Sequence, residues 1–306
     1  MNIFKINPSF SERVWGGQKL NSMGYNIPKD KKIGEAWVIS AHENGMGFAA
    51  EGIWKGKSVK EIFESNRTLF GNVQGSFPLL VKILTPEQNL SVQVHPNDEL
   101  AKKHNDFGKP ESWYVLDCPD NAKLIYGHTA KTKKELAEMI EKDQWKELLV
   151  EVPVKKGDFL YVPPGKIHAV TPNVVVYELQ RSSDITYRVY DYGRLENGKP
   201  RKLHIEDTIV STTVPDTNIA IINNATKLIH SNEYFSLYLY ETSKETKPFK
   251  LIEKTGWLQI TVIEGTGKIN GVDYILGDCS IACDLNESSS LDITGNLKVL
   301  ISWIKL

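Results

Sequence analysis

The order of apolar and polar residues along the chain predicts mostly short strands. Runs rich in β-branched and aromatic residues recur between Gly, Pro and Asn, and such runs are typical of strands. The predicted strands are 77–84, 90–95, 112–116, 159–162, 174–179, 235–240, 257–264 and 299–304. Helical periodicity is confined to 58–70, 98–104, 133–149 and 204–211. Strands at this spacing predict a mainly β fold, a sandwich or barrel, rather than a parallel α/β sheet.

A weak internal repeat in the sequence predicts two such β units. The pair Gly157-Asp158 and the pair Gly277-Asp278 each lead into a predicted strand. Two further hairpin turns are predicted near the second pair, at 264–267 and 270–271. We therefore expect two domains, 1–225 and 226–306.

Length and charge narrow the classes of function. The chain has 306 residues, and 37 Lys and Arg against 38 Asp and Glu give a net charge of −1. A near-neutral, evenly spread charge gives no field to hold a nucleic acid or an anionic membrane. No apolar run approaches the roughly 20 residues that cross a bilayer, and residues 1–10 lack signal-peptide features. With three cysteines and no paired CxxC motif, we expect a cytoplasmic protein.

One predicted strand carries a row of polar side chains. Ser91, Gln93 and His95 alternate with apolar residues, and because a strand has a period of two, the three side chains share one face. A second candidate ligand, Glu111, opens the next strand after Lys109-Pro110. This pattern fits an amphipathic strand facing solvent as well as a metal site.

The most specific local pattern ends at His168. The sequence reads Gly157-x5-Pro163-x-Gly165-x2-His168, which resembles the second signature motif of cupin barrels. A strand there runs into a Pro-Pro-Gly turn that fixes the position of the histidine. Lys166, within this turn, is expected to be a solvated lysine.

Four of these residues together suit a transition metal. Gln93, His95, Glu111 and His168 offer two imidazoles, one carboxylate and one amide oxygen, and we predict one Zn²⁺ per chain. Two histidines and a carboxylate also describe the facial triad of non-haem iron enzymes. A cupin oxygenase that uses Fe²⁺ is therefore an alternative, although the glutamine ligand and the absence of an HxH pair count against it.

Several motifs together resemble one family, type I mannose-6-phosphate isomerase, in its shorter bacterial form. The motifs that carry the resemblance lie at 14–17, 33–40, 93–96, 109–111, 163–168 and 180–188. The resemblance covers roughly residues 5–210, and the rest of the chain only by its cupin-like pattern. The large helical insertion of longer relatives is missing, with only 133–149 in its place.

The resemblance implies a fold and an activity. The fold is two cupin-type jelly-roll units: a catalytic, metal-binding domain over 1–225 and a metal-free companion over 226–306. The activity is interconversion of mannose 6-phosphate and fructose 6-phosphate through an enediol-type intermediate, by a monomer or homodimer. A third possibility, from another class, is a non-catalytic cupin that binds a phosphosugar.

The resemblance also assigns roles to individual residues. It gives metal binding to Gln93, His95, Glu111 and His168, and catalysis to Arg188. It places Lys109 and Asp184 in or beside the site as candidates for proton transfer. Substrate or phosphate contact falls to Lys82, Ser91 and Arg194. A histidine found in some relatives before the Lys-Pro-Glu motif is Gly108 here. The five other histidines are expected to be surface or structural residues.

Overall fold

The computed structural model describes residues 1–242 and 248–306 and is mainly β, as predicted. The strands of the first half are β1 (Asn2–Asn7), β2 (Ser9–Gly17), β3 (Ile33–Ile39), β4 (Phe48–Ala49), β5 (Leu79–Leu84), β6 (Val92–Val94), β7 (Glu111–Asp117), β8 (Lys123–His128) and β9 (Leu149–Pro153). The next are β10 (Phe159–Val162), β11 (His168–Ala169), β12 (Val175–Arg181), β13 (Tyr187–Tyr190), β14 (Leu195–Glu196) and β15 (Lys199–Pro200). The last are β16 (Lys227–Ser231), β17 (Ser236–Glu241), β18 (Phe249–Lys250), β19 (Trp257–Ile269), β20 (Val272–Ile275), β21 (Cys279–Cys283), β22 (Ser290–Leu291) and β23 (Ile293–Trp303).

Each of the four segments predicted to be helical contains a helix. The α-helices are α1 (Val59–Ser65), α2 (Asp98–Ala101), α3 (Lys133–Glu141), α4 (Trp145–Leu148) and α5 (Ile205–Ser211). The 3-10 helices are η1 (Lys19–Met23), η2 (Glu43–Gly45), η3 (Gly52–Trp54), η4 (Arg67–Phe70) and η5 (Lys102–His104). The segment 133–149 is divided because Asp143 adopts a φ of 52°, which breaks the helix between α3 and α4. None of the helices in the described part of the chain has the length and apolar character needed to cross a membrane.

The chain folds into two compact units. The first comprises residues 1–12, 18–83 and 225–306, and the second comprises residues 13–17 and 84–224. The first unit therefore combines an N-terminal segment with the C-terminal one. Within it, the rings of Phe63 and Phe70 pack edge-on against Trp257 of β19, with centroids 5.9 and 5.7 Å apart. The functional division at residue 225 and the two-barrel description stay predictions.

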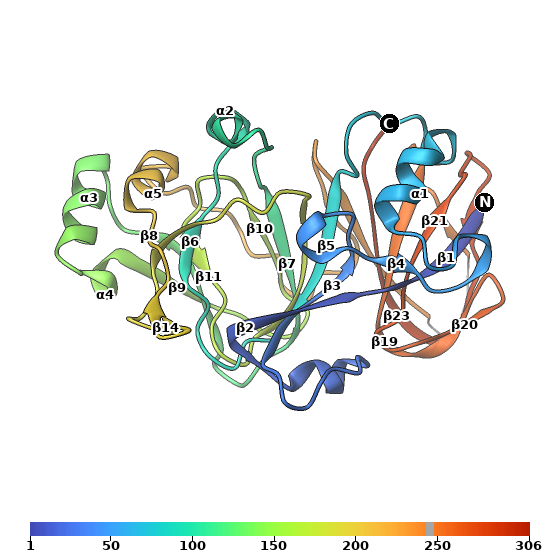
Figure 1. Ribbon diagram of the computed structural model, residues 1–306, viewed down its shortest axis with the longest axis horizontal. Coiled ribbons are helices and arrows are strands. Elements are labelled where there is room, and N and C mark those ends of the chain that lie inside the picture. Colours follow the sequence, from blue (N-terminus) through green and yellow to red (C-terminus); the bar gives the residue numbers. More distant parts are fainter. Residues whose placement is uncertain (243–247) are drawn as a thin grey trace. The chain divides into compact units, whose positions relative to one another are not determined.

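The second unit holds the sheet that carries most of the predicted site. Its five strands follow the order β13-β6-β11-β8-β9, and β10, β7 and β12 form a separate antiparallel group. Figure 1 shows α3, α4 and α5 beside β8 and β9. Apolar side chains of α3 and of this sheet share one core, which includes Leu136, Ile125 and Val189. Because side chains alternate along a strand, Gln93 of β6 faces the opposite side of the sheet from Val92 and Val94.

The internal repeat at the two Gly-Asp pairs is a repeated turn. The Asp158 carboxylate accepts the N–H of Lys155 at 2.8 Å, and the Asp278 carboxylate accepts the N–H of Ile275 at 2.9 Å. The preceding glycines have φ values of 93° and 89°, which favour glycine. Each unit therefore uses the same turn to enter a strand, β10 in one and β21 in the other.

One of the two predicted hairpins is wrong. Asn270 and Gly271 do form the turn between β19 and β20, with φ values of 49° and 80°. Residues 264–267, however, lie inside β19, which continues to Ile269 opposite β23. A Cβ at Gly265 would lie 1.8 Å from the carbonyl oxygen of Asn296. This glycine therefore permits a close approach of two strands rather than a turn.

Candidate metal centre and active site

Three of the four predicted metal ligands meet in the interior of the second unit. His95 follows β6, Glu111 opens β7 and His168 opens β11. One ligand atom from each residue lies within 4.8 Å of the others. The three side chains are 1%, 0% and 0% exposed. Residues distant in sequence are thus gathered into one group with metal-ligand chemistry.

Both imidazoles are oriented by backbone carbonyls. The Nδ1 of His95 lies 2.9 Å from the carbonyl oxygen of Ile185, and the Nδ1 of His168 lies 2.8 Å from that of Lys166. A carbonyl only accepts, so each Nδ1 carries the proton and each Nε2 presents a lone pair. Burial, and then the ammonium of Lys109, lower the pKa of His95 to about 3, so its ring is neutral at physiological pH.

The two lone pairs face a carboxylate. The Nε2 of His95 lies 3.1 Å from Oε2 of Glu111, and the Nε2 of His168 lies 3.2 Å from Oε1. Yet neither carboxylate oxygen accepts a hydrogen bond of normal geometry from the described residues. Two acceptor nitrogens aimed at two buried carboxylate oxygens repel one another unless positive charge lies between them. The ammonium of Lys109 supplies such charge beside His95 and Oε2 of Glu111, and a metal ion would supply it to all three ligands. The donor set therefore fits a divalent metal ion.

Gln93 joins this group from the middle of three strands. On β6 it is in register with His168 of β11 on one side and with Arg188 of β13 on the other. Directly opposite residues of antiparallel strands point to the same face, so the three side chains form a row. The amide nitrogen of Gln93 lies 3.4 Å from the Nε2 of His168, and a half-turn of this amide presents its oxygen to the same point.

Lys109 is in direct contact with two of the proposed metal ligands, His95 and Glu111. Its Nζ is 3.2 Å from the Nε2 of His95 and 3.2 Å from Oε2 of Glu111. Burial favours the neutral amine, but Glu111, Glu178 and Asp184 outweigh it and raise the pKa of Lys109. The same contact lowers the pKa of Glu111 well below its usual range, against the effect of burial. Lys109 is therefore an ammonium in this environment.

Arg188 is held at the other end of the polar row. Its Nε donates to the hydroxyl of Ser91 at 3.1 Å, and its Nη1 donates to the carbonyl of Lys202 at 3.0 Å. Its backbone N–H donates to the Nδ1 of His204 at 3.2 Å. Burial, and then the charge of Arg201, lower the pKa of Arg188, but a guanidinium stays protonated in proteins. The structure thus joins Arg188 and Ser91, two residues predicted for different roles.

Arg194 shares an aspartate with a second arginine. Its Nη2 binds Oδ1 of Asp191, and its Nη1 donates to the carbonyl of Asn89. Arg201 binds the same carboxylate, with its Nε 2.8 Å from Oδ2. Two guanidinium groups with one carboxylate leave a local excess of positive charge. Neither Asp191 nor Arg201 is predicted from the sequence, because neither lies in a motif with recognisable spacing.

Lys82 and Asp184 occupy different settings. Lys82 belongs to β5 of the first unit, is 5% exposed, and has its Nζ 4.5 Å from the ring centre of Trp37. Asp184 is exposed in the second unit and is close enough to Lys109 to raise its pKa. The predicted roles of both residues stay predictions.

Glu178 is a further buried charge in this region that sequence reasoning missed. It is 4% exposed and lies on β12, where it pairs with Trp113 of β7. Its Oε2 accepts the indole N–H of Trp113 at 3.1 Å, and the Trp113 ring packs edge-on against His168, with centroids 5.3 Å apart. In the sequence, Glu178 and Gln180 alternate with apolar residues, and this alternation could have indicated that their side chains share one face of a strand.

The expectation for Lys166 is wrong. It is 3% exposed, and its Nζ lies 2.8 Å from Oδ2 of Asp216. A lysine can be buried in this way when a carboxylate and further acceptors satisfy its ammonium. The partner is far along the chain, so the local turn sequence did not reveal it.

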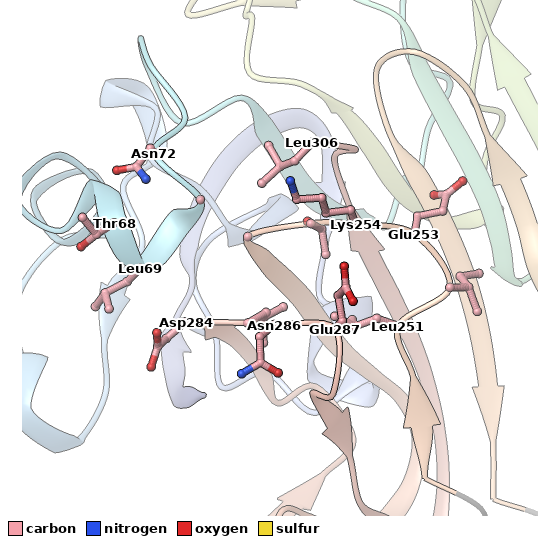
Figure 2. Close-up of a pocket in the computed structure, with 15 residues that line it drawn as sticks. Thr68, Leu69, Asn72, Leu251, Glu253, Lys254, Asp284, Asn286, Glu287 and Leu306 are labelled. Atoms are coloured by element: carbon pink, nitrogen blue, oxygen red, sulfur yellow. The ribbon is translucent and has the colours of Figure 1, made fainter.

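The first unit has a separate cavity of about 650 Å³. Figure 2 shows Lys254, Asp284 and Glu287 among the labelled side chains that line it. Glu253, also in its wall, accepts hydrogen bonds from Ser236 and other donors. No histidine lines this cavity among the described residues. It therefore does not offer the imidazole ligands of the second unit.

Comparison with known proteins identifies the family. Residues 3–122 match the catalytic domain of phosphomannose isomerase type I. The chain is 43% identical over 286 residues to the mannose-6-phosphate isomerase ManA of Bacillus subtilis (strain 168), covering 88% of each chain. It is 39% identical over 311 residues to the mannose-6-phosphate isomerase of Streptococcus mutans, covering 97% of this chain and 96% of that protein.

Comparison of the fold with solved structures identifies the same family as comparison of the sequences. The crystal structure of the mannose 6-phosphate isomerase from Bacillus subtilis matches with a TM-score of 0.92 and 38% identity, covering 99% of this chain and 100% of that one. Phosphomannose isomerase from Salmonella typhimurium shares the fold, with a TM-score of 0.78 at 14% identity and full coverage of both chains. The family expected from the sequence motifs is confirmed: the chain belongs to the type I phosphomannose isomerases.

Proposed function

We propose that this protein interconverts mannose 6-phosphate and fructose 6-phosphate. The observation that carries the proposal is the buried group of His95, Glu111 and His168, in a chain that is 43% identical to a mannose-6-phosphate isomerase. The reaction moves a proton between C1 and C2 of the sugar through an enediol-type intermediate. It needs a polarised carbonyl, a proton carrier and a positive group near the developing negative charge.

The cation of this site is proposed to be Zn²⁺, one per chain, held by Gln93, His95, Glu111 and His168. Neutral imidazoles with one carboxylate are a usual ligand set of catalytic zinc. When bound, a divalent cation in such a site acts as a Lewis acid on a carbonyl or hydroxyl oxygen. The single carboxylate among the ligands leaves the site with net positive charge, as that chemistry requires.

Three residues are proposed to handle charge and protons. Arg188 lies in register with Gln93, so its permanent charge is placed to offset negative charge on the enediolate oxygens. Lys109 contacts His95 and Glu111 and is one candidate for carrying the proton. Asp184 is the nearby carboxylate that can accept a proton. Lys109 and Asp184 both stay candidates for the proton carrier.

The phosphate is proposed to bind beyond Arg188, away from the metal ligands. Ser91 lies two residues before Gln93, just ahead of β6, which is about 6.6 Å of extended chain at 3.3 Å per residue. Ser91 and the positive charges of Arg194 and Arg201 lie at that end of the second unit. Binding energy from this non-reacting group would position the sugar for reaction at the metal centre. Lys82 is proposed as a further substrate contact.

Neither alternative function is favoured. The relatives are named as mannose-6-phosphate isomerases, which supports neither an iron-dependent oxygenase nor a non-catalytic phosphosugar-binding cupin. We also propose that the protein acts in the cytoplasm as a monomer or homodimer. With a net charge of −1, it is proposed to have no nucleic-acid or membrane partner.

A coupled assay of mannose 6-phosphate conversion, with and without a chelator, tests the proposal. We expect chelation to abolish activity and added Zn²⁺ to restore it, and His168→Ala to lose both bound metal and activity. His42→Ala, which changes a histidine that caps a 3-10 helix in the first unit, is the matched control and should keep both. Full activity in metal-free protein would refute the proposed role of the metal.

A further inference from the structure

A buried ion pair lies beside the turn that carries His168. The Nζ of Lys166 donates to both carboxylate oxygens of Asp216, at 3.0 and 2.8 Å, and to the carbonyl of Thr217 at 2.7 Å. The same nitrogen lies 4.4 Å from the ring centre of Tyr126. An ammonium has three N–H groups, and here each has an acceptor. The Lys166 side chain is therefore held in one place.

The backbone of Lys166 orients a proposed metal ligand. Its carbonyl oxygen accepts the Nδ1–H of His168 at 2.8 Å, which leaves Nε2 for the metal centre. Metal-binding histidines commonly donate their second N–H to a carbonyl or carboxylate, and this bond fixes the ring and its tautomer. A shift of the Lys166 carbonyl would therefore redirect Nε2 of His168.

The chain that follows α5 packs against the same turn. Residues 212–217, here called the brace segment, include Thr213 and Asp216. A Cβ at Gly165 would lie 2.4 Å from Oγ1 of Thr213, so the contact is close. The carbonyl of Gly165 accepts the N–H of Thr213 at 2.9 Å, and the N–H of Gly165 donates to the carbonyl of His95 at 2.9 Å. The turn is therefore bonded to the brace segment and to both proposed imidazole ligands.

Space around the ion pair is limited from another side as well. Gly127 of β8 has a φ of +112°, and a Cβ there would lie 2.2 Å from Oδ2 of Asp216 and 3.2 Å from Nζ of Lys166. Its N–H donates to the carbonyl of Ile167 at 2.8 Å. Strand β8 thus leaves room for the ion pair and bonds to the turn beside it.

We propose that Asp216 is a positioning residue for the metal centre. By holding Lys166, it fixes the carbonyl that orients His168, and so it sets the affinity of the site for its cation. Asp216 touches neither the ligand group nor the substrate in this role. The inference rests on the proposed metal site and extends it to a residue of the brace segment.

Zn²⁺ titration of chelator-stripped protein against a competing chromophoric chelator tests this role. We expect Asp216→Ala to weaken Zn²⁺ binding by about 10- to 100-fold. Because that change leaves a buried ammonium without its partner, the double variant Lys166→Met/Asp216→Asn, which removes both charges, is measured alongside and should show the same loss. The matched control is Glu151→Ala, which breaks the exposed pair of Lys123 and Glu151 across β8 and β9 and should leave Zn²⁺ affinity unchanged.

The electronic spectrum of the Co²⁺-substituted protein distinguishes positioning from a general structural role. A redirected imidazole changes the ligand geometry and hence the visible bands, whereas a loss of stability alone does not. If both variants show the Zn²⁺ affinity and the Co²⁺ bands of the wild-type protein, the proposal is overturned. If the unsubstituted protein itself binds no Zn²⁺, the metal site is refuted, and the role of Asp216 with it.

Discussion

Arg188 is the residue on which the proposed reaction depends most, apart from the metal ligands. Its guanidinium is half-buried and anchored to Ser91 and to the carbonyl of Lys202. Anchoring at two points sets its position before substrate arrives, and a preorganised charge in a partly dehydrated site stabilises developing negative charge more strongly than water does. The residue contributes nothing to the ligand group, so its effect on rate is separable from metal binding.

Replacing Arg188 with alanine should lower kcat by about 100- to 1000-fold, the usual cost of removing one stabilising donor from a transition state. Metal content should stay unchanged, because Arg188 is not a ligand. Arg188→Lys should recover part of the rate, since it keeps the charge and loses the planar fork. Steady-state kinetics with metal analysis of the same samples provides the check, and a near-normal kcat in the alanine variant would contradict the proposed role.

At this scale, the sequence revealed residues that lie in short-range patterns. Gln93 and His95 are separated by one residue on a strand, and the turn before His168 has a recognisable spacing. Lys166 shows why other residues were misjudged. Its environment is set by Asp216, which a local pattern does not include. Burial of a charge depends on partners brought together by the fold, and these are not visible in one segment.

Strand β6 is the element that organises the site. It lies between β13 and β11, so a single residue of it, Gln93, faces Arg188 on one neighbour and His168 on the other. A shift of register by one residue would send this whole row to the apolar face that packs against the helices. The apolar residues of β6, Val92 and Val94, are both fully buried in that helix-covered core and so hold the register.

Helix α5 is fixed at its C-terminus by a lysine from α3. The Nζ of Lys133 donates to the carbonyls of Ile209, Val210 and Thr212, where the helix has carbonyls without partners inside it. Lys133→Ala should lower the free energy of unfolding by about 1–2 kcal/mol. Lys134→Ala, a neighbour whose side chain is 87% exposed, should change it by less than about 0.5 kcal/mol. Urea unfolding followed by circular dichroism compares the two variants. Equal losses of unfolding free energy in both would argue against a stabilising role of the Lys133 hydrogen bonds.

The elements themselves were largely predictable, and their limits were not. Periodicity indicated a helix over 133–149, but Asp143 at positive φ divides it. Strands such as β8 and β13 were missed, because they are runs of six and four residues that pairing with neighbouring strands stabilises. Gly265 was misread as a turn, since a glycine that admits a close strand looks the same in sequence as one that turns the chain.

On the scale of the whole chain, the two units share a turn but differ in chemistry. The turn at Asp158 leads through β10 to His168, whereas the strand after Asp278 continues as Ser280-Ile-Ala-Cys283. The proposed metal ligands all belong to the second unit. The repeated turn could be predicted from the sequence because a Gly-Asp turn is a local pattern. The grouping of residues 18–83 with the C-terminal segment was not predicted. That grouping depends on contacts such as those of Phe63 with Trp257.

The first unit contains a histidine whose titration should appear in the stability of the protein. Burial, and then the charge of Lys305, lower the pKa of His230 to about 4, against about 6.5 in an unfolded chain. Between these two values the unfolded chain binds a proton that the folded chain does not, so stability falls as the pH is lowered from about 6.5 to 4. For this half-buried ring we expect a loss of about 2 kcal/mol, after discounting for solvent screening.

His230→Leu should remove this contribution, so the free energy of unfolding of the variant should fall less with acid than that of the wild-type protein. Urea unfolding from pH 4 to 7 in the presence of a chelator, which removes any contribution of metal binding, measures the difference. Parallel curves for the two proteins would contradict the prediction.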